Sequence, residues 1–181
     1  MKVAVILANG FEEVEALLVV DVLRRLDIHV DTITINKDYP VKSSRNVTVL
    51  ADKLLDNDIY EYDMIILPGG MPGATNMRDD CRVIEALQYF DQENKYIGAI
   101  CAAPICLSKA GIHKNKNLTS YPAKEFEDVL SEANYLNQAV VIDGKLITSQ
   151  GPATTFEFAF AIANMLGKDT SSLKQAMLYS K

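Results

Sequence analysis

The sequence has few of the side chains that form metal sites and disulfide frameworks: three cysteines and two histidines in 181 residues. An odd number of cysteines without a Cys-x-x-Cys pair excludes a disulfide framework. His29 and His113 stand in unrelated contexts. We therefore predict no zinc or other metal site.

Positive charge is also scarce: the sequence has 18 Lys and Arg residues but 24 Asp and Glu residues, which gives a net charge of −6. Such a chain lacks the electrostatic footprint of a nucleic-acid partner, and anionic membrane surfaces should repel it. No window approaches the ~20 apolar residues of a membrane span.

The apolar residues 3–8 end at Asn9, and Glu12, Glu13 and Glu15 follow. We expect a buried first strand of a cytoplasmic protein rather than a signal peptide.

Strand-like apolar runs alternate with helix-length amphipathic segments. The expected strands are 3–8, 30–35, 47–50, 64–67, 96–100, 134–142 and 145–148, and the expected helices are 13–26, 81–94, 154–166 and 171–179, with one more beginning near Pro104. This alternation predicts an α/β fold with a mainly parallel sheet and helices on both faces. Asp143-Gly144 predicts a small hairpin. Without a linker, repeat or low-complexity tract, residues 1–181 are expected to form a single domain.

A cysteine lies at the point where a buried strand meets a helix. Cys101 follows the apolar residues 96–100 and is surrounded by small residues, as a nucleophile elbow requires. The N-terminus of a helix favours the thiolate, so we expect the pKa of Cys101 to lie below the usual ~8.5. The alternative is a buried structural cysteine. Cys106, in an apolar stretch, is expected in the core, and Cys81 near an exposed helix start.

Two other strand ends supply a carboxylate and a glycine turn, and such ends meet at one edge of an α/β sheet. Glu12 and Glu13 suit the start of a helix, whereas Glu15 lies further in and can face the crevice. The Gly69-Gly70 turn is either a plain tight turn or an oxyanion pocket made of backbone N–H groups. Ala102, not histidine, follows Cys101, so a Cys-His protease lacks its base.

Four motifs in order then resemble one family. They are Asn9-Gly10-Phe11-Glu12-Glu13-Val14-Glu15, Leu67-Pro68-Gly69-Gly70, Ala99-Ile100-Cys101-Ala102-Ala103-Pro104 and Thr148-Ser149-Gln150-Gly151-Pro152. Together they resemble the ThiJ/PfpI superfamily, in the branch of the Parkinson-disease-associated protein (DJ-one) and its bacterial relatives. The resemblance covers nearly the whole chain and implies a flavodoxin-like α/β sandwich and a homodimer.

The resemblance also implies roles for individual residues. Cys101 matches the family's reactive cysteine and Glu15 the glutamic acid that hydrogen-bonds it. Gly70 and Ala102 match positions whose backbone N–H groups face the reacting oxygen, and Arg45 matches an arginine near the dimer face. The family's pocket histidine is replaced by Tyr121, a poor proton shuttle at neutral pH.

The leading hypothesis is a cofactor-free stress-response enzyme for reactive 2-oxoaldehydes, a glyoxalase that converts methylglyoxal to lactate or a deglycase of early adducts. The alternative is a redox sensor or holdase chaperone in which Cys101 is oxidised to sulfinate without turnover. A hydrolase or amidase is a third reading. We expect an outlying backbone conformation at Cys101 with Glu15 ~3 Å from its sulfur. A small crevice should form beside Tyr121, Pro152 and the Gly69-Gly70 turn.

Overall fold

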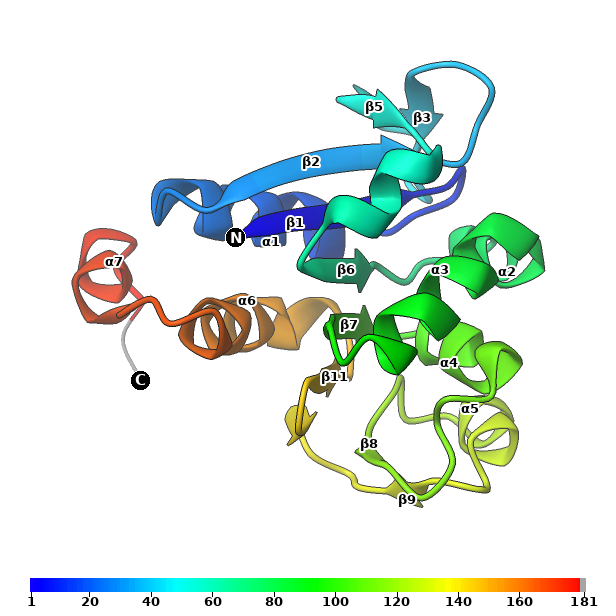
Figure 1. Cartoon of the computed structure of the whole chain (residues 1–181). Helices are drawn as coiled ribbons and strands as arrows, with labels where there is room; N and C mark the ends of the chain where they lie inside the picture. The colour runs from blue at the N-terminus through cyan, green and yellow to red at the C-terminus, as the bar shows by residue number, and fades with distance from the viewer. Residues whose placement is uncertain (180–181) are drawn as a thin grey trace.

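A seven-stranded sheet forms the middle layer of the computed structural model, which describes residues 1–179 (Figure 1). In spatial order the strands are β10 (Val140–Asp143), β11 (Leu146–Ser149), β7 (Tyr96–Ile100), β6 (Met64–Leu67), β1 (Lys2–Leu7), β2 (His29–Thr34) and β5 (Lys53–Leu54). All neighbours are parallel except β10 and β11, which form the antiparallel hairpin around Asp143-Gly144. The expected mainly parallel sheet with a small hairpin is confirmed.

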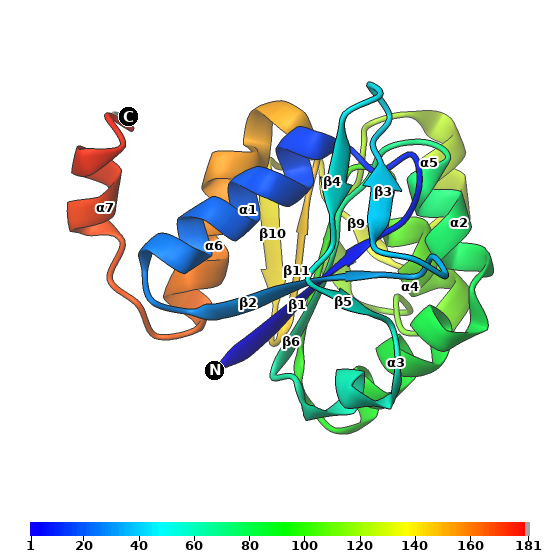
Figure 2. The same ribbon diagram turned by 90° about the horizontal axis from the view of Figure 1, so that it is seen from above.

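Helices cover both faces of the sheet (Figure 2). They are α1 (Glu13–Arg25), α2 (Gly73–Asp79), α3 (Cys81–Gln92), α4 (Pro104–Ala110), α5 (Lys124–Val129), α6 (Thr155–Met165) and α7 (Ser171–Ala176), with 3-10 turns at Asn57–Glu61 and Pro152–Thr154. α1 and α6 pack on one face, whereas α2, α3 and α4 pack on the other. The flavodoxin-like arrangement expected from the sequence is therefore confirmed.

The continuous apolar runs of the central strands follow from this double cover. In β1, Ala4 and Ile6 belong to the core beneath α2–α4, whereas Val3 and Val5 belong to the core beneath α1 and α6. Because successive side chains of a strand point to opposite faces, a strand covered on both sides has no polar positions in its middle. None of the helices within residues 1–179 combines the length and the apolar content needed to span a bilayer.

The short strand expected at 47–50 is β4 (Thr48–Leu50), which pairs with β3 (Pro40–Lys42) in a hairpin outside the main sheet. Several other short elements differ from the expectation. The strand expected over 134–142 is two strands, β9 (Asn134–Tyr135) and β10, and β9 pairs with β8 (Asn117–Leu118) instead of the main sheet. The last helix ends at Ala176 rather than at 179. α2, α5 and β5 were not expected at all.

The topology brings four strand ends to one edge. β2 and β6 lie on opposite sides of β1, so strand order runs outward in opposite directions from the gap between β1 and β6, although these strands are parallel. β7 and β11 end in register, with Ile100 beside Ser149, while Leu67 pairs with Ala99. Ligands of doubly wound sheets bind at such a switch point, outside the carboxyl ends of the strands.

Candidate active site

Cys101 occupies a strained turn between β7 and α4. Its φ angle is +62°, in the left-handed region that a residue with a side chain rarely adopts. Its N–H donates to the carbonyl oxygen of Ser149 at 2.9 Å, and its own carbonyl accepts from the N–H of Tyr121 at 2.8 Å. These bonds hold the turn in place, as a strained residue requires. The predicted outlying conformation at Cys101 is confirmed.

Glu15 lies in the first turn of α1, fully buried, and faces Cys101. Its Oε2 accepts a hydrogen bond from the N–H of Gly69 at 2.7 Å. The Glu15 carboxyl and the Cys101 thiol are hydrogen-bonding neighbours, and each alters the pKa of the other. The predicted proximity of the two side chains is therefore confirmed, whereas the expected separation of ~3 Å stays a prediction.

Burial shifts the pKa of both groups upward. It raises the pKa of Glu15 to about 7, against smaller opposing effects of the Gly69 N–H and the Cys101 hydrogen bond. Burial, the charge of Glu15 and the hydrogen bond to Glu15 raise the pKa of the Cys101 thiol to about 12, although the N–H groups of Ala102 and Gly70 lower it. The expected low thiol pKa is wrong, because desolvation and a neighbouring carboxylate outweigh two N–H donors at a short helix. Above pH 7 the proton lies mainly on sulfur, and the two groups titrate as a pair.

The backbone N–H groups of Gly70 and Ala102 lie next to the Cys101 thiol and lower its pKa. That they face the reacting oxygen, as the resemblance implies, stays a prediction. Gly70 has a φ angle of +84°, and a Cβ atom there would lie 2.6 Å from the carbonyl oxygen of Gly10. Only glycine fits this position. Two converging N–H donors beside a nucleophile are the arrangement that stabilises a developing oxyanion.

A cavity of about 350 Å³ opens above the sulfur. This volume lies at the small end of ligand sites, which span roughly 300–1,000 Å³. Its lining residues are Glu12, Glu15, Ser44, Arg45, Gly70, Met71, Cys101, Ala102, Tyr121, Glu125, Phe126 and Pro152. The structure thus brings together Arg45, Tyr121 and Pro152 with Cys101, as expected. Gly69 lies against Cys101 and Glu15 without lining the cavity.

Five lining residues were not expected from the sequence: Glu12, Ser44, Met71, Glu125 and Phe126. Glu12 suits the start of a helix, but its carboxylate accepts a hydrogen bond from the Ser44 hydroxyl at 2.9 Å and so ties the β3–β4 hairpin to the site. Met71 directly follows the Gly69-Gly70 turn, which is a signal that sequence reasoning could have used.

The other two cysteines lie away from this cavity and in the surroundings expected from the sequence. Cys106 is buried, and its thiol donates to the carbonyl oxygen of Ala74 at 3.6 Å. Cys81 is exposed as the first residue of α3.

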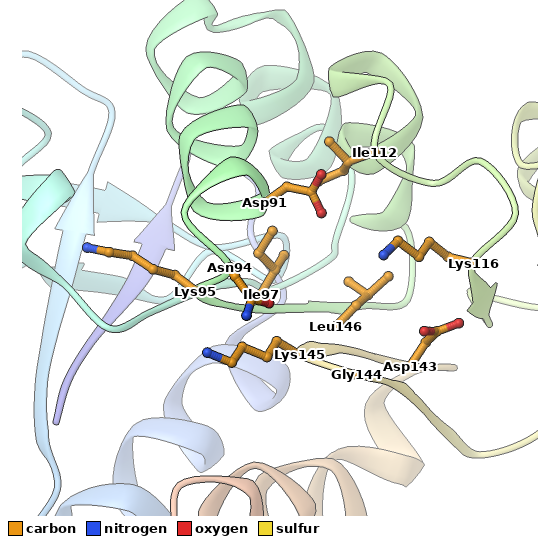
Figure 3. Close-up of a pocket in the computed structure, with 10 residues that line it drawn as sticks. All are labelled: Asp91, Asn94, Lys95, Ile97, Ile112, Lys116, Asp143, Gly144, Lys145 and Leu146. Atoms are coloured by element: carbon orange, nitrogen blue, oxygen red, sulfur yellow. The ribbon is translucent and has the colours of Figure 1, made fainter.

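A second, smaller cavity of about 110 Å³ lies at the opposite end of the sheet, where β7 and β11 begin (Figure 3). Two of its charged groups already have protein partners. The Lys95 ammonium donates to the carbonyl oxygens of Tyr60 and Tyr62, and the Asp143 carboxylate accepts from the N–H of Asn117. The site at Cys101 therefore remains the candidate for chemistry.

Comparison with known proteins identifies the family of this chain. The sequence profile of the DJ-1/PfpI family matches residues 1–165. Protein dj-1beta of Drosophila melanogaster is 41% identical over 167 residues, which cover 91% of this chain and 89% of that protein. The crystal structure of Drosophila melanogaster DJ-1beta superimposes with a TM-score of 0.94 at 37% identity, covering 99% of this chain and 98% of that one.

A relative with a named activity is more distant. The glutathione-independent glyoxalase DJ-1 of Schizosaccharomyces pombe is 32% identical over 171 residues, which cover 90% of this chain and 89% of that protein. Family profile, sequence identity and fold agree over most of the length. The chain belongs to the DJ-1/PfpI family.

Proposed function

We propose that this chain is a cysteine-dependent, cofactor-free enzyme of the cytoplasm that acts on reactive 2-oxoaldehydes and converts methylglyoxal to lactate. One observation supports this most directly: a buried carboxyl with a pKa of about 7 lies against the Cys101 thiol, beneath the N–H groups of Gly70 and Ala102. A general base works best when its pKa is close to the operating pH. The activity named for the fission-yeast relative gives independent support.

The first step adds the thiol to the aldehyde. The Glu15 carboxylate takes the thiol proton while sulfur bonds to the aldehyde carbon, and the N–H groups of Gly70 and Ala102 stabilise the oxygen that becomes negative. Glu15 then returns the proton to this oxygen. The product is a hemithioacetal on Cys101, and Glu15 is again a carboxylate.

The second step moves a hydrogen between two carbons. Glu15 removes the proton from the former aldehyde carbon, which leaves an enediolate, and delivers this proton to the neighbouring carbonyl carbon. The proton of the hemithioacetal hydroxyl passes to the oxygen of that second carbon, so that the first carbon is oxidised and the second is reduced. The resulting thioester on Cys101 is hydrolysed by water, which releases the hydroxy acid and restores the thiol. Substrate and water enter, hydroxy acid leaves, and no external oxidant or reductant is consumed.

Lactate formation from methylglyoxal tests this mechanism in the wild type, Cys101→Ser and Glu15→Gln. Both variants should lose at least about a hundredfold in rate, because each removes a group that forms or breaks a bond. Cys81→Ser, at an exposed cysteine outside the cavity, is the matched control and should keep the wild-type rate. Equal rates in all four proteins would sink the proposal.

The redox-sensor alternative uses the same residues in another way. The N–H groups of Gly70 and Ala102 are placed to bind the oxygens of a Cys101 sulfinate. However, oxidation proceeds through the thiolate, and burial together with Glu15 keeps the thiol protonated. A protonated thiol beside a carboxylate base supports an enzyme in which the base removes the thiol proton during the reaction. A sensor would need a thiolate that is already present in the free protein. Peroxide-driven oxidation of Cys101 without any aldehyde turnover would favour the sensor.

We also propose that two copies of the chain associate through the exposed side of α1 and the β3–β4 hairpin. The two elements are joined, because the N–H of Ser44 donates to the carbonyl oxygen of Phe11 at 2.7 Å. Together they present large apolar side chains to solvent, namely Val14, Leu17, Tyr39, Val47 and Leu50. A cluster of this kind is typical of a protein interface.

A further inference from the structure

Apolar side chains surround the opening above Cys101. Met71, Tyr121, Phe126 and Pro152 all line the cavity, and Met71 and Tyr121 are 51% and 47% exposed. Large apolar side chains left open beside a reactive group indicate a surface that a ligand covers. A three-carbon aldehyde needs only a small part of about 350 Å³.

The backbone of Tyr121 is bonded directly to Cys101, and its ring packs against a second ring. The Tyr121 N–H donates to the carbonyl oxygen of Cys101 at 2.8 Å, and the Tyr121 carbonyl accepts from the N–H of Ala123 at 2.8 Å. Its ring meets Phe126 edge to face, with centroids 6.1 Å apart and planes at 77°. The two rings therefore form an aromatic wall of the cavity.

The ring and the sulfur border the same space. A Cβ atom placed on Gly151 would lie 3.8 Å from Cδ2 of Tyr121 and 4.0 Å from Sγ of Cys101. A substrate whose aldehyde carbon is bonded to this sulfur would thus place its substituent next to the Tyr121 ring. An aromatic substituent gains more here than a methyl group, because ring pairs attract through offset and edge-to-face contacts beyond their buried area.

We propose that the preferred substrates are 2-oxoaldehydes with an aromatic substituent, such as phenylglyoxal, and that Tyr121 and Phe126 bind the substrate ring. This inference rests on the proposed function. The reaction is the one given above: the thiol adds to the aldehyde, hydrogen moves to the ring-bearing carbon, and water releases an aromatic hydroxy acid. Tyr121 is the residue that determines specificity.

The ratio of kcat/KM for phenylglyoxal to kcat/KM for methylglyoxal tests the proposal. Differences between preparations in the fraction of active protein cancel in this ratio. Tyr121→Ala should lower this ratio about three- to tenfold, the size of one lost ring pair. Tyr121→Phe retains the ring and should retain the ratio. Val129→Ala changes an exposed residue of α5 outside the cavity and is the matched control. An unchanged ratio in Tyr121→Ala would overturn the inference.

A second measurement separates this inference from the proposed function, since alkylation needs no turnover. The alkylating reagents 2-chloroacetophenone and chloroacetone carry a phenyl and a methyl group, respectively, as phenylglyoxal and methylglyoxal do. Each loses chloride as sulfur bonds to its methylene carbon. Their rates at Cys101, measured in a Cys81→Ser background and divided by their rates with glutathione, should favour the aromatic reagent, and Tyr121→Ala should abolish the preference. This result without aldehyde turnover would support the aromatic site while contradicting the proposed enzyme. Turnover without any aromatic preference would overturn this inference alone.

Discussion

Gly69 and Glu15 are joined by a hydrogen bond of 2.7 Å between the glycine N–H and the buried carboxylate oxygen Oε2. A Cβ atom on Gly69 would lie 2.8 Å from this same oxygen and 2.8 Å from Cβ of Cys101. Both distances are too short for any side chain. The absence of a side chain at Gly69 therefore allows the acid and the thiol to approach each other.

Gly69→Ala should separate Glu15 from Cys101 and lower turnover of methylglyoxal about ten- to a hundredfold, because small displacements of reacting groups are costly. Overpacking should also destabilise the fold by roughly 1–3 kcal/mol. Gly144→Ala, in the β10–β11 turn outside the cavity at Cys101, is the control for turnover, since a Cβ there meets no atom within 4 Å. Steady-state rates and thermal unfolding measure both effects, and equal losses of turnover in the two variants would contradict this role for Gly69.

Val14→Asp should convert a dimer into a monomer, because it places a charge in the proposed apolar interface on α1. Val14 is 45% exposed in the single chain, so the substitution leaves the core intact. Light scattering after size-exclusion chromatography measures the mass. Ile142→Asp, at a similarly exposed residue on the edge strand β10, is the control and should remain a dimer. A wild-type monomer, or a dimer that persists in Val14→Asp, would contradict the proposed interface.

The central strands and the main site residues were predictable because the sequence carries their signals locally. A strand covered on both faces has to be apolar throughout, and small residues around a cysteine at a strand end indicate a tight turn. Cys101, Glu15 and Gly70 each follow such a strand, and parallel strands bring their carboxyl ends to one edge.

The elements and properties that were missed depend on distant contacts or on burial. α5 contains no buried residue, so its sequence has no apolar stripe to reveal it. α2 is short and includes Gly73, Thr75 and Asn76, which are poor helix formers. The direction of the thiol pKa shift depends on how deeply Cys101 and Glu15 are desolvated together, and only the packed structure shows this.

Glu15→Gln should stabilise the fold at alkaline pH. Folding raises the pKa of Glu15 from 4.5 to about 7, so its contribution to stability is complete below pH 4.5 and is lost as the pH rises through 7. The loss is about 3 kcal/mol at most, at 1.36 kcal/mol for each pKa unit.

Thermal unfolding between pH 5 and pH 8 measures this change. The melting temperature of Glu15→Gln should rise relative to the wild type across this range. Glu85→Gln, at an exposed position of α3, should show no such trend. Parallel curves for the wild type and Glu15→Gln would mean that Glu15 titrates normally in the folded protein.

Glu15→Gln should also separate thiol reactivity from turnover. In the wild type, sulfur loses its proton chiefly to Glu15, so the thiolate fraction stops rising once the carboxyl titrates near pH 7. In Glu15→Gln no carboxylate opposes the thiolate, and this fraction continues to grow about tenfold per pH unit. Alkylation of Cys101 by iodoacetamide should therefore be similar in both proteins near pH 7 and about tenfold faster in the variant at pH 8, although the variant forms no lactate.

Glu15→Asp retains the charge and should follow the wild-type pH profile of alkylation, with turnover lowered by the shorter reach of the side chain. Identical alkylation profiles in the wild type and Glu15→Gln would show that the two groups are not coupled, and lactate formation by Glu15→Gln would exclude Glu15 as the group that moves the proton.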